Sequence, residues 1–513
     1  SSILSAPKIL VNNGNILVGS NNSSKANTSV IRGNKIYIEQ DAEKGLQNDS
    51  ALIIYSSGKV EISSSATTHG NIYLGSNNAM TIALGGALIF ADSSYLSYPN
   101  DASVIDYGNN NIPAVESYPF NSFDTLLLSL PFSSVLASEI DNEFKLFSWS
   151  ENSHTFNLID GSSSINGGSG NLFVTKPSPS VQQFSGTLNT GDIDVSLSKS
   201  NNGLNLIGNP YPSAIDFDRI NLSENIQSSI YIFNPISNNY EIIQQNGLNM
   251  YSENAIIDQN QAFFVFTDNN STFNFTSSCQ THNLDPVIKD VSSLNHISMT
   301  FSTGGKFIDA VGLIFGSSAS ENYQNKEDAI ELENVQNLRY INSYTYSADN
   351  KKLAINSKLI PADESTISIF MISDMEGFYE FHLDKKTLSA GVEVFLIDPA
   401  SNDTTDLQTN QYYYFDYNNA NVEKEFLLLF KGNMVNADED FANTNIYSFN
   451  KNVYVNTSSQ INKVEIYTIT GVKIISENVN SNTAIIKTNL ENGVYIVKAY
   501  LSDEIKTQKI IIN

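Results

Sequence analysis

Few residues of this sequence have a type and spacing suited to catalysis. The zinc-binding signature HExxH and the nucleophile signature GxSxG do not occur, and the single cysteine, Cys279, has no second cysteine with which to share a zinc ion. Cys279 and His282 are three residues apart at an expected strand end, a spacing that does not bring a thiolate and its base into one site. We therefore predict no catalytic residue. The histidines lie in different segments and are His69, His154, His282, His296 and His382.

Three pairs of carboxylates have a spacing that could serve metal binding. In a strand, residues i and i+2 point to the same side, so each pair could hold Ca²⁺ together with backbone carbonyls. None continues into an EF-hand series, and 54 acidic residues produce such pairs by chance. As glycosidase acids they would have to face each other across a cleft, which no sequence feature locates. We predict no cofactor and no metal, with Ca²⁺ at Asp216 and Asp218 as the alternative. The other pairs are Asp192 with Asp194 and Asp438 with Asp440.

Charge and hydropathy exclude two classes of partner. Lys and Arg total 28 against 54 Asp and Glu, a formal net charge of −26. A chain this acidic repels phosphate backbones, so we expect no nucleic acid partner. The longest apolar run, Thr81 to Ala91, is shorter than the ~18 residues of a transmembrane helix, so we expect no membrane-spanning segment in this chain. The chain begins at Ser1 without a Met, as a processed chain would.

Almost every segment has the pattern of a β-strand. Short runs rich in Ile, Val, Tyr, Phe and Thr alternate with clusters of Asn, Gly, Ser and Asp. At roughly 150 residues per domain, 513 residues suggest three or four domains. Residues 325–338 come closest to an amphipathic helix, with a loop containing a short strand as the alternative. The sequence thus predicts an all-β, multi-domain protein.

An internal repeat marks residues 1–112. The segment "GNILVGSNN" at 14–22 returns as "GNIYLGSNN" at 70–78, and residues 33–40 and 57–64 are looser copies. Each copy is a turn glycine followed by a short alternating strand. The pattern predicts a β-repeat region of solenoid-like stacked coils or a meander, in which each unit buries its face against its neighbours. Because the spacing is uneven, common turn and strand usage in an Asn-rich protein is the alternative.

From Pro113 the strands become longer and more aromatic. Residues 113–285 and 286–432 each carry strands at a spacing typical of antiparallel β-sandwiches. Residues 433–445 are polar, acidic and aperiodic, and we interpret them as a linker. The last block, 446–513, contains seven short strand-like runs and is expected to be a small Ig-like sandwich.

The end of the chain is unusually apolar, although chain termini tend to be polar and poorly ordered. The closing run is "IKTQKIIIN", residues 505–513. In the preceding run, "GVYIVKAY" at 493–500, the residues of both faces are apolar, which indicates a central or covered strand. These two runs predict a closing β-hairpin.

This last block resembles the type A C-terminal sorting domain of proteins that Bacteroidetes export through the type IX secretion system. The matching features are "VEIYTITGVKI", "LENGVYIVKAY" and "IKTQKIIIN", in the order and spacing of that family and over about 70 residues. The resemblance implies an export address that is bound by the outer-membrane translocon and its shuttle β-barrel, and that is commonly removed on attachment to the cell surface. We expect the partner barrel to grip the apolar terminal strand. The residues that we expect to be recognised are Gly471, Gly493, Tyr495, Lys506, Lys509, Ile510, Ile511 and Ile512.

A looser resemblance extends upstream. The segment "NGLNLIGNPYPSAIDFDRI", residues 202–220, resembles a stretch common in large surface proteins of the same bacteria, with Phe217 where Trp is usual. The resemblance implies lineage and fold and carries no activity. Pro210 and Pro212 fix φ and predict a rigid turn, which either presents Tyr211 to a ligand or forms a corner of the core.

We therefore expect a non-enzymatic, adhesin-like or structural protein that is secreted or held at the cell surface in association with the outer membrane. The alternative is a glycan-binding or polysaccharide-degrading surface protein of the same secretion class. A hydrolase would need facing carboxylates or a metal ion. A lectin-like module in 113–285 would stack sugars on exposed Tyr rings and on Trp149, and packing of Trp149 inside a sandwich would argue against it.

Overall fold

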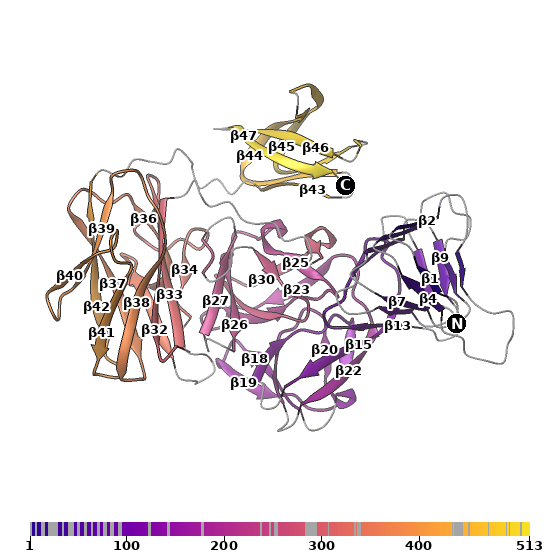
Figure 1. Cartoon of the computed structure of the whole chain (residues 1–513), viewed down its shortest axis with the longest axis horizontal. Coiled ribbons are helices and arrows are strands. Elements are labelled where there is room, and N and C mark those ends of the chain that lie inside the picture. The colour runs from indigo at the N-terminus through magenta and orange to yellow at the C-terminus, as the bar shows by residue number, and fades with distance from the viewer. Residues whose placement is uncertain are drawn as a thin grey trace.

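The fold is that of a computed structural model, in which the protein is all-β, as the sequence predicts. Figure 1 shows a row of β-units with the C-terminal sandwich beside it. Within residues 1–94 the structure describes the strands alone. Beyond them it describes residues 95–121, 125–140, 144–175, 179–235, 239–245, 248–250, 255–282, 295–305, 307–332, 335, 340–432, 434, 445–449, 452–469, 471–488, 490–491, 493–502 and 505–512.

The N-terminal strands form stacked parallel coils. Consecutive strands do not pair, and each strand pairs in parallel with the one three places later, so every turn of chain adds one strand to each of three sheets. Parallel pairing distinguishes stacked coils from a meander, whose neighbours are antiparallel. The first sheet has β1 (Ile3–Ser5), β4 (Ser29–Arg32), β7 (Leu52–Tyr55), β10 (Ile72–Leu74) and β13 (Leu96–Pro99). The second has β2 (Lys8–Val11), β5 (Lys35–Ile38), β8 (Lys59–Ile62), β11 (Ala79–Ile82) and β14 (Ser103–Asp106), and the third β3 (Ile16–Val18), β6 (Leu46–Asn48), β9 (Ser65–Thr68) and β12 (Ala87–Phe90).

The structural repeat follows the looser copies in the sequence. The copies at 33–40 and 57–64 contain β5 and β8, which pair in register with Lys35 opposite Lys59. The nearly identical copies at 14–22 and 70–78 contain β3 and β10, which belong to different sheets. Two segments with nearly the same turn and strand sequence therefore need not occupy the same sheet of the coil.

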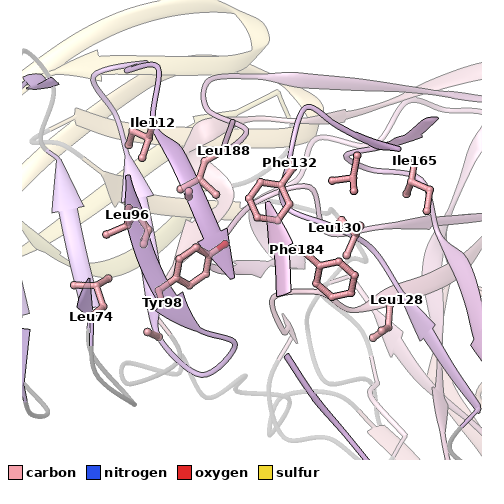
Figure 2. Close-up of a cluster of buried hydrophobic side chains, with 14 of the residues drawn as sticks. Leu74, Leu96, Tyr98, Ile112, Leu128, Leu130, Phe132, Ile165, Phe184 and Leu188 are labelled. Atoms are coloured by element: carbon pink, nitrogen blue, oxygen red, sulfur yellow. The ribbon is translucent and has the colours of Figure 1, made fainter. Parts of the chain in front are cut away.

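The coil continues past residue 112, where a domain boundary was expected. β15 (Pro113–Phe120) pairs in parallel with β13 and antiparallel with β22 (Ser180–Thr187), so the first sheet extends into the second block. One hydrophobic core runs from Ile72 to Leu188, and Figure 2 shows Tyr98 of the coil and Leu188 of the second block between Leu96 on one side and Phe132 and Phe184 on the other. The coil is thus capped by the strands that follow it.

The second block contains small sheets around a second core. The "GNPYPS" turn forms a corner of this core rather than a loop that presents Tyr211. Tyr211 is fully buried, and its hydroxyl donates to the carbonyl of Phe275 at 2.7 Å. The strands are β16 (Thr125–Leu128), β17 (Ser134–Leu136), β18 (Lys145–Ser150), β19 (Thr155–Leu158), β20 (Ser164–Asn166), β21 (Asn171–Val174), β23 (Ile193–Leu197), β24 (Leu204–Gly208), β25 (Ala214–Asp216), β26 (Ile226–Asn234), β27 (Asn239–Gln244), β28 (Ile256–Ile257), β29 (Ala262–Thr267), β30 (Ser271–Phe275) and β31 (Gln280–Thr281). The helices of the described residues are single 3-10 turns: η1 (Ala137–Glu139), η2 (Phe217–Arg219) and η3 (Ser277–Cys279).

The third block is a two-layer sandwich. Its strands form one sheet order with β35 (Ile341–Tyr346) in the middle, paired with β36 (Lys352–Leu359) on one side and with β37 (Ser365–Ser373) on the other. The strands on the two sides of β35 form two layers that face each other across one core. Rings from the two halves meet there, as Phe301 and Phe426 do with centroids 5.5 Å apart. One pair departs from the expected antiparallel pattern, because β33 (Phe307–Gly316) and β36 are parallel. The other strands are β32 (Asn295–Thr303), β34 (Ala329–Ile330), β38 (Gly377–Thr387), β39 (Glu393–Asp398), β40 (Asp403–Asp406), β41 (Tyr412–Tyr417) and β42 (Lys424–Lys431).

The second and third blocks share a core of their own. Leu206, Tyr231 and Phe264 of the second block pack with Ile314 and Ile355 of the third. The segment 325–338, for which the sequence suggested a helix or a loop with a short strand, contains the short strand β34. This strand lies at the junction of the two blocks, where the Tyr231 hydroxyl donates to the carbonyl of Ile330 at 2.7 Å. These blocks are therefore rigidly joined by apolar burial and buried hydrogen bonds.

The C-terminal sandwich has five long strands where the sequence suggested seven short ones. The strands are β43 (Asn445–Phe449), β44 (Asn452–Thr468), β45 (Lys473–Lys487), β46 (Gly493–Leu501) and β47 (Ile505–Ile512). β44 is long because irregularities between Asn456 and Lys463 let one strand change partners: its first half pairs with β43 and its second half with β46. The core of this domain is made of its own residues, from Ile446 to Ile512.

Candidate recognition surface on the C-terminal sandwich

The C-terminal sandwich differs in charge from the rest of the chain. Residues 446–513 contain seven lysines against five acidic residues, whereas residues 1–445 contain 21 basic and 49 acidic residues. The domain therefore carries a formal charge of +2 and the remainder −28. A partner that attracts this domain electrostatically would not be attracted by the rest of the protein.

The domain also exposes an unusual share of aliphatic side chains. Of the fifteen large hydrophobic residues that are exposed in the described part of the chain, six belong to this small domain. Scattered single exposures are normal, but several within one small domain indicate an interaction surface. The six residues are Ile469, Val472, Ile474, Ile485, Val494 and Ile505.

Gly471 shapes the hairpin that presents three of these residues. Its φ is +86°, a conformation that costs an L-residue about 1–2 kcal/mol. The N–H of Gly471 donates to the carbonyl of Thr468 at 3.0 Å, and Thr468 and Val472 are joined across the turn by a 2.9 Å backbone bond. The β44–β45 hairpin thus ends in an ordered tip, on which Ile469 and Val472 are 70% and 62% exposed.

A buried carboxylate organises one face of the sheet. The Glu465 side chain is only 4% exposed and accepts hydrogen bonds from the hydroxyls of Tyr467 and Tyr500, each at 2.6 Å. The Lys463 and Lys473 ammonium groups lie 3.0 and 3.2 Å from its other oxygen. The two hydroxyls and the adjacent lysines hold the pKa of Glu465 well below its usual range, so the carboxylate is ionised at neutral pH. One fixed anion therefore positions two cations and two aromatic rings.

Cation–π contacts extend this network. The Lys463 ammonium lies 4.1 Å from the centroid of the Tyr500 ring, and that of Lys498 lies 5.3 Å from the centroid of Tyr467. The register places Lys498 directly opposite Glu465 on the neighbouring strand. The face is thus an ordered basic and aromatic surface within an otherwise acidic protein.

The register brings most of the predicted recognition residues to one end of this sheet. Thr468, beside the Gly471 turn, lies opposite Tyr495, and Tyr495 lies opposite Ile510. Gly493 pairs with Ile512, and the Tyr495 hydroxyl donates to the carbonyl of Glu491 at 2.9 Å. The turn glycine, the tyrosine and the terminal isoleucines of the resemblance therefore form one contiguous region.

The terminal strand is apolar because it completes the core of its own domain. Ile510 and Ile512 are 4% and 1% exposed and belong to the core of this domain, so recognition of this strand by a partner stays a prediction that would involve its backbone and its exposed side chains. The side chain of Ile511 lies outside the described residues. Lys509 is exposed and Lys506 half-buried on the same strand, opposite Ile496 and Ala499. In the described structure β47 pairs with β46 and is an end strand of its sheet, the position at which strand addition occurs.

The sandwich contacts the second block through a small patch. The guanidinium of Arg219 lies 5.4 Å from the centre of the Tyr447 ring, and the Tyr447 hydroxyl lies 3.4 Å from that of Ser278. Tyr447 stacks on Tyr454 with ring centroids 5.0 Å apart. The contact is polar and aromatic, unlike the apolar cores that join the other units.

The remaining chemical candidates have structural roles. Cys279 is fully buried, and burial raises the pKa of its thiol, which disfavours the reactive thiolate form. The His282 ring bonds the hydroxyls of Thr81 and Ser103 at 2.9 and 2.8 Å and thereby ties the second block to the coil. Asp216 caps η2 through the Asp218 N–H at 3.1 Å and pairs with Arg219 at 3.1 Å, so its carboxylate is already engaged.

Asp192, Asp194 and Trp149 likewise make hydrogen bonds within the fold. Asp192 accepts from the Ser277 N–H at 2.8 Å and Asp194 from the Asn274 amide at 2.5 Å, whereas residues 438 and 440 lie outside the described part. Trp149 is half-buried against the core shared by the second and third blocks, and its ring N–H donates to the carbonyl of Leu204 at 2.8 Å. Trp149 is therefore neither fully exposed nor wholly inside the sandwich, and its lectin-like role stays a prediction.

Within the described residues, no group of three or more His, Cys, Asp or Glu side chains is placed to hold a metal ion. No helix in the described part of the chain is long and apolar enough to cross a membrane. No protein-family model matches the sequence, and no curated protein matches it significantly.

Proposed function

We propose that this chain is a non-enzymatic, adhesin-like or structural protein that is secreted or held at the cell surface after export by the type IX secretion system. In this proposal residues 446–513 are the export signal, bound by the outer-membrane translocon and its shuttle β-barrel. The observation that carries it is the separateness of the C-terminal sandwich, which has its own core, the opposite charge and a concentration of exposed aliphatic residues. These are the properties that a recognition domain needs and that a further stalk domain does not.

The folded domain offers two places for recognition. One is the hairpin tip with Ile469 and Val472, and the other is the end strand β47 with Lys506 and Lys509. The residues that carry the resemblance lie close to both. The buried isoleucines support recognition indirectly, by holding β47 in place.

A pull-down from outer membranes of a bacterium with type IX secretion tests the proposal. The baits are the intact chain, a chain that ends at Val435, and the intact chain with Ile469→Ser and Val472→Ser. We expect an outer-membrane barrel to be captured by the intact chain, lost with the truncated chain and weakened by the hairpin variant. Val422→Ser, which alters an exposed valine of the third block, is the matched control. Capture of the same partners by the intact and the truncated chain would refute the proposal.

A further inference from the structure

A row of aromatic rings lies on the outer face of the third block. β41 is an end strand of its sheet and pairs with β38. Both strands are labelled at the left of Figure 1. Alternation along each strand sends Tyr379, Phe381 and Phe415 into the core. The residues at the alternate positions point outward. They are Phe378 and His382 on β38, and Tyr412 and Tyr414 on β41.

The outward rings are nearly parallel to one another. Phe378 and Tyr414 have centroids 5.7 Å apart and planes within 6°, and Tyr412 and Tyr414 have centroids 6.4 Å apart and planes within 6°. His382 stacks on Tyr412 with centroids 4.2 Å apart and planes within 15°. Phe378, Tyr414 and Tyr412 are 62%, 51% and 40% exposed. The four rings therefore form a continuous ordered surface, here called the aromatic row.

The aromatic row is held rigidly. Both strands are paired from Gly377 opposite Tyr417 to His382 opposite Tyr412, so the backbone beneath every ring is fixed by a ladder of hydrogen bonds. The His382 ring is oriented by the Asp384 carboxylate, with 2.7 Å between Nδ1 and the carboxylate oxygen. A partner would thus bind rings whose backbone positions are already fixed.

The core of the sandwich does not require these rings. The opposite face of the same two strands already supplies the buried aromatic residues of the core. Single exposed apolar residues need no explanation, but contiguous large rings on an edge strand favour aggregation and persist where they bind something. The aromatic row is therefore a binding surface rather than surplus packing.

We propose that the aromatic row binds a neutral polysaccharide. A pyranose ring has a face of C–H bonds that complements the negative face of an aromatic ring, and its hydroxyl groups need hydrogen-bond acceptors close by. Glu380 and Asp416 alternate with the rings on the same face, since Glu380 lies opposite Tyr414 and Asp416 opposite Phe378. Flat rings with acceptors between them suit a chain of sugars.

Charge distinguishes this ligand from anionic glycans. The acceptors on this face are carboxylates, and the chain outside the C-terminal sandwich carries a formal charge of −28. Uronic acid and sulfated polysaccharides would be repelled at both short and long range. Partial burial and the neighbouring Glu380 carboxylate, to which the hydroxyl is hydrogen-bonded, raise the pKa of Tyr414, so the hydroxyl stays protonated. The carboxylates of this face therefore supply acceptors, and His382, its basic member among the described residues, is already paired with Asp384.

Binding of the intact chain to polysaccharides tests the inference. The probes are neutral cellulose, β-glucan, xylan, mannan and amylose, and the charged glycans alginate and chitosan. We expect at least one neutral polysaccharide to retain the wild-type protein in affinity electrophoresis, with no loss of binding between roughly 0.05 and 0.5 M NaCl, because screening acts on charges alone. Retention by alginate or chitosan but by no neutral probe, or by no probe, would overturn the proposal.

Variants locate the binding at the aromatic row. Tyr412→Ala with Tyr414→Ala should weaken retention at least tenfold, and Val422→Ala, also exposed on the third block, should leave it unchanged. If the double variant has a lower melting temperature than the wild type, Phe378→Ala on the neighbouring strand provides the same test. Unchanged affinity in a folded variant of the row would overturn the proposal. None of these substitutions alters the C-terminal sandwich, so the comparison between variants is independent of the export proposal.

Discussion

The buried carboxyl group of Glu116 should make the stability of this protein depend on pH in a direction opposite to most acidic residues. Glu116 lies on β15 opposite Tyr98 of the coil and is fully buried. One carboxyl oxygen accepts from the Asn260 amide at 3.0 Å, and the other makes no hydrogen bond to any described residue. Burial raises the pKa of Glu116 to about 8, although the hydrogen bond from Asn260 opposes the shift.

The size of the effect follows from the two pKa values. An unfolded glutamate titrates near pH 4.3. Between that pH and about 8 the folded protein holds a proton on Glu116 that the unfolded chain releases, so the free energy of unfolding falls as the pH rises. At about 1.4 kcal/mol per pH unit the loss approaches 5 kcal/mol at pH 8. Glu116→Gln keeps an acceptor for Asn260 and cannot ionise. The variant should match the wild type near pH 4.5 and exceed its stability by about 3–4 kcal/mol at pH 7.

Hydrogen exchange measured by mass spectrometry on peptides that cover β13 and β15, between pH 5 and 8, reports this local stability. Asp309 and Asp328 are also buried acids whose pKa is raised to about 7, but their contribution cancels in the difference between variant and wild type. Glu139→Gln, at an exposed position near the same core, is the matched control. Parallel pH profiles of wild type and Glu116→Gln, or a less stable variant at pH 8, would refute the reasoning.

Three further substitutions test other parts of the fold. Glu151 accepts hydrogen bonds from three backbone N–H groups of residues 200–203, each at 2.8 Å, so Glu151→Ala should cost about 2–3 kcal/mol in denaturant unfolding followed by Trp149 fluorescence. An unchanged midpoint would contradict this role. Tyr231→Phe leaves a carbonyl at the junction of the second and third blocks without its donor and should cost about 1–2 kcal/mol by the same assay, with wild-type stability as the contrary result. Gly471→Val should lower the melting temperature of the C-terminal sandwich through about 1–2 kcal/mol of backbone strain, and equal melting curves would show that the hairpin adapts.

Period and composition were sufficient to predict the strands but not their partners. Alternation of apolar and polar residues depends on local geometry, so the all-β class could be predicted from short windows. Pairing depends on segments far apart in the chain. The near-identical copies at 14–22 and 70–78 lie in different sheets, while the weaker pair at 33–40 and 57–64 stacks in register. Likewise the change of texture at Pro113 is real in the sequence, yet the first sheet continues across it.

The candidate surfaces were less predictable for a related reason. In the run "QYYYFDY" both faces of the strand are aromatic, so alternation cannot tell which face is buried. The structure buries Phe415 and exposes Tyr412 and Tyr414, because the core lies on one side of an end strand. The signal in the sequence for an exposed aromatic surface was that this run has aromatic residues on both faces, although the core lies on only one of them. The isoleucines at the end of the chain were ambiguous in another way. A strand that is apolar because it contacts a partner and a strand that is apolar because it completes the domain core have the same sequence pattern. The structure places Ile510 and Ile512 in the domain core, and recognition of their strand by a partner stays a prediction.

The way in which the units are joined bears directly on the two proposals. The coil, the second block and the third block share hydrophobic cores across their boundaries, so none of them can be removed without exposing apolar surface to water. The C-terminal sandwich shares no core with them in the described structure and touches them through Tyr447, Arg219 and Ser278. An export signal that is read and then removed has to be separable in this sense. The aromatic row lies on the third block, within the inseparable part, so a protein that loses residues 446–513 on reaching the surface would keep the surface that we propose for binding polysaccharide.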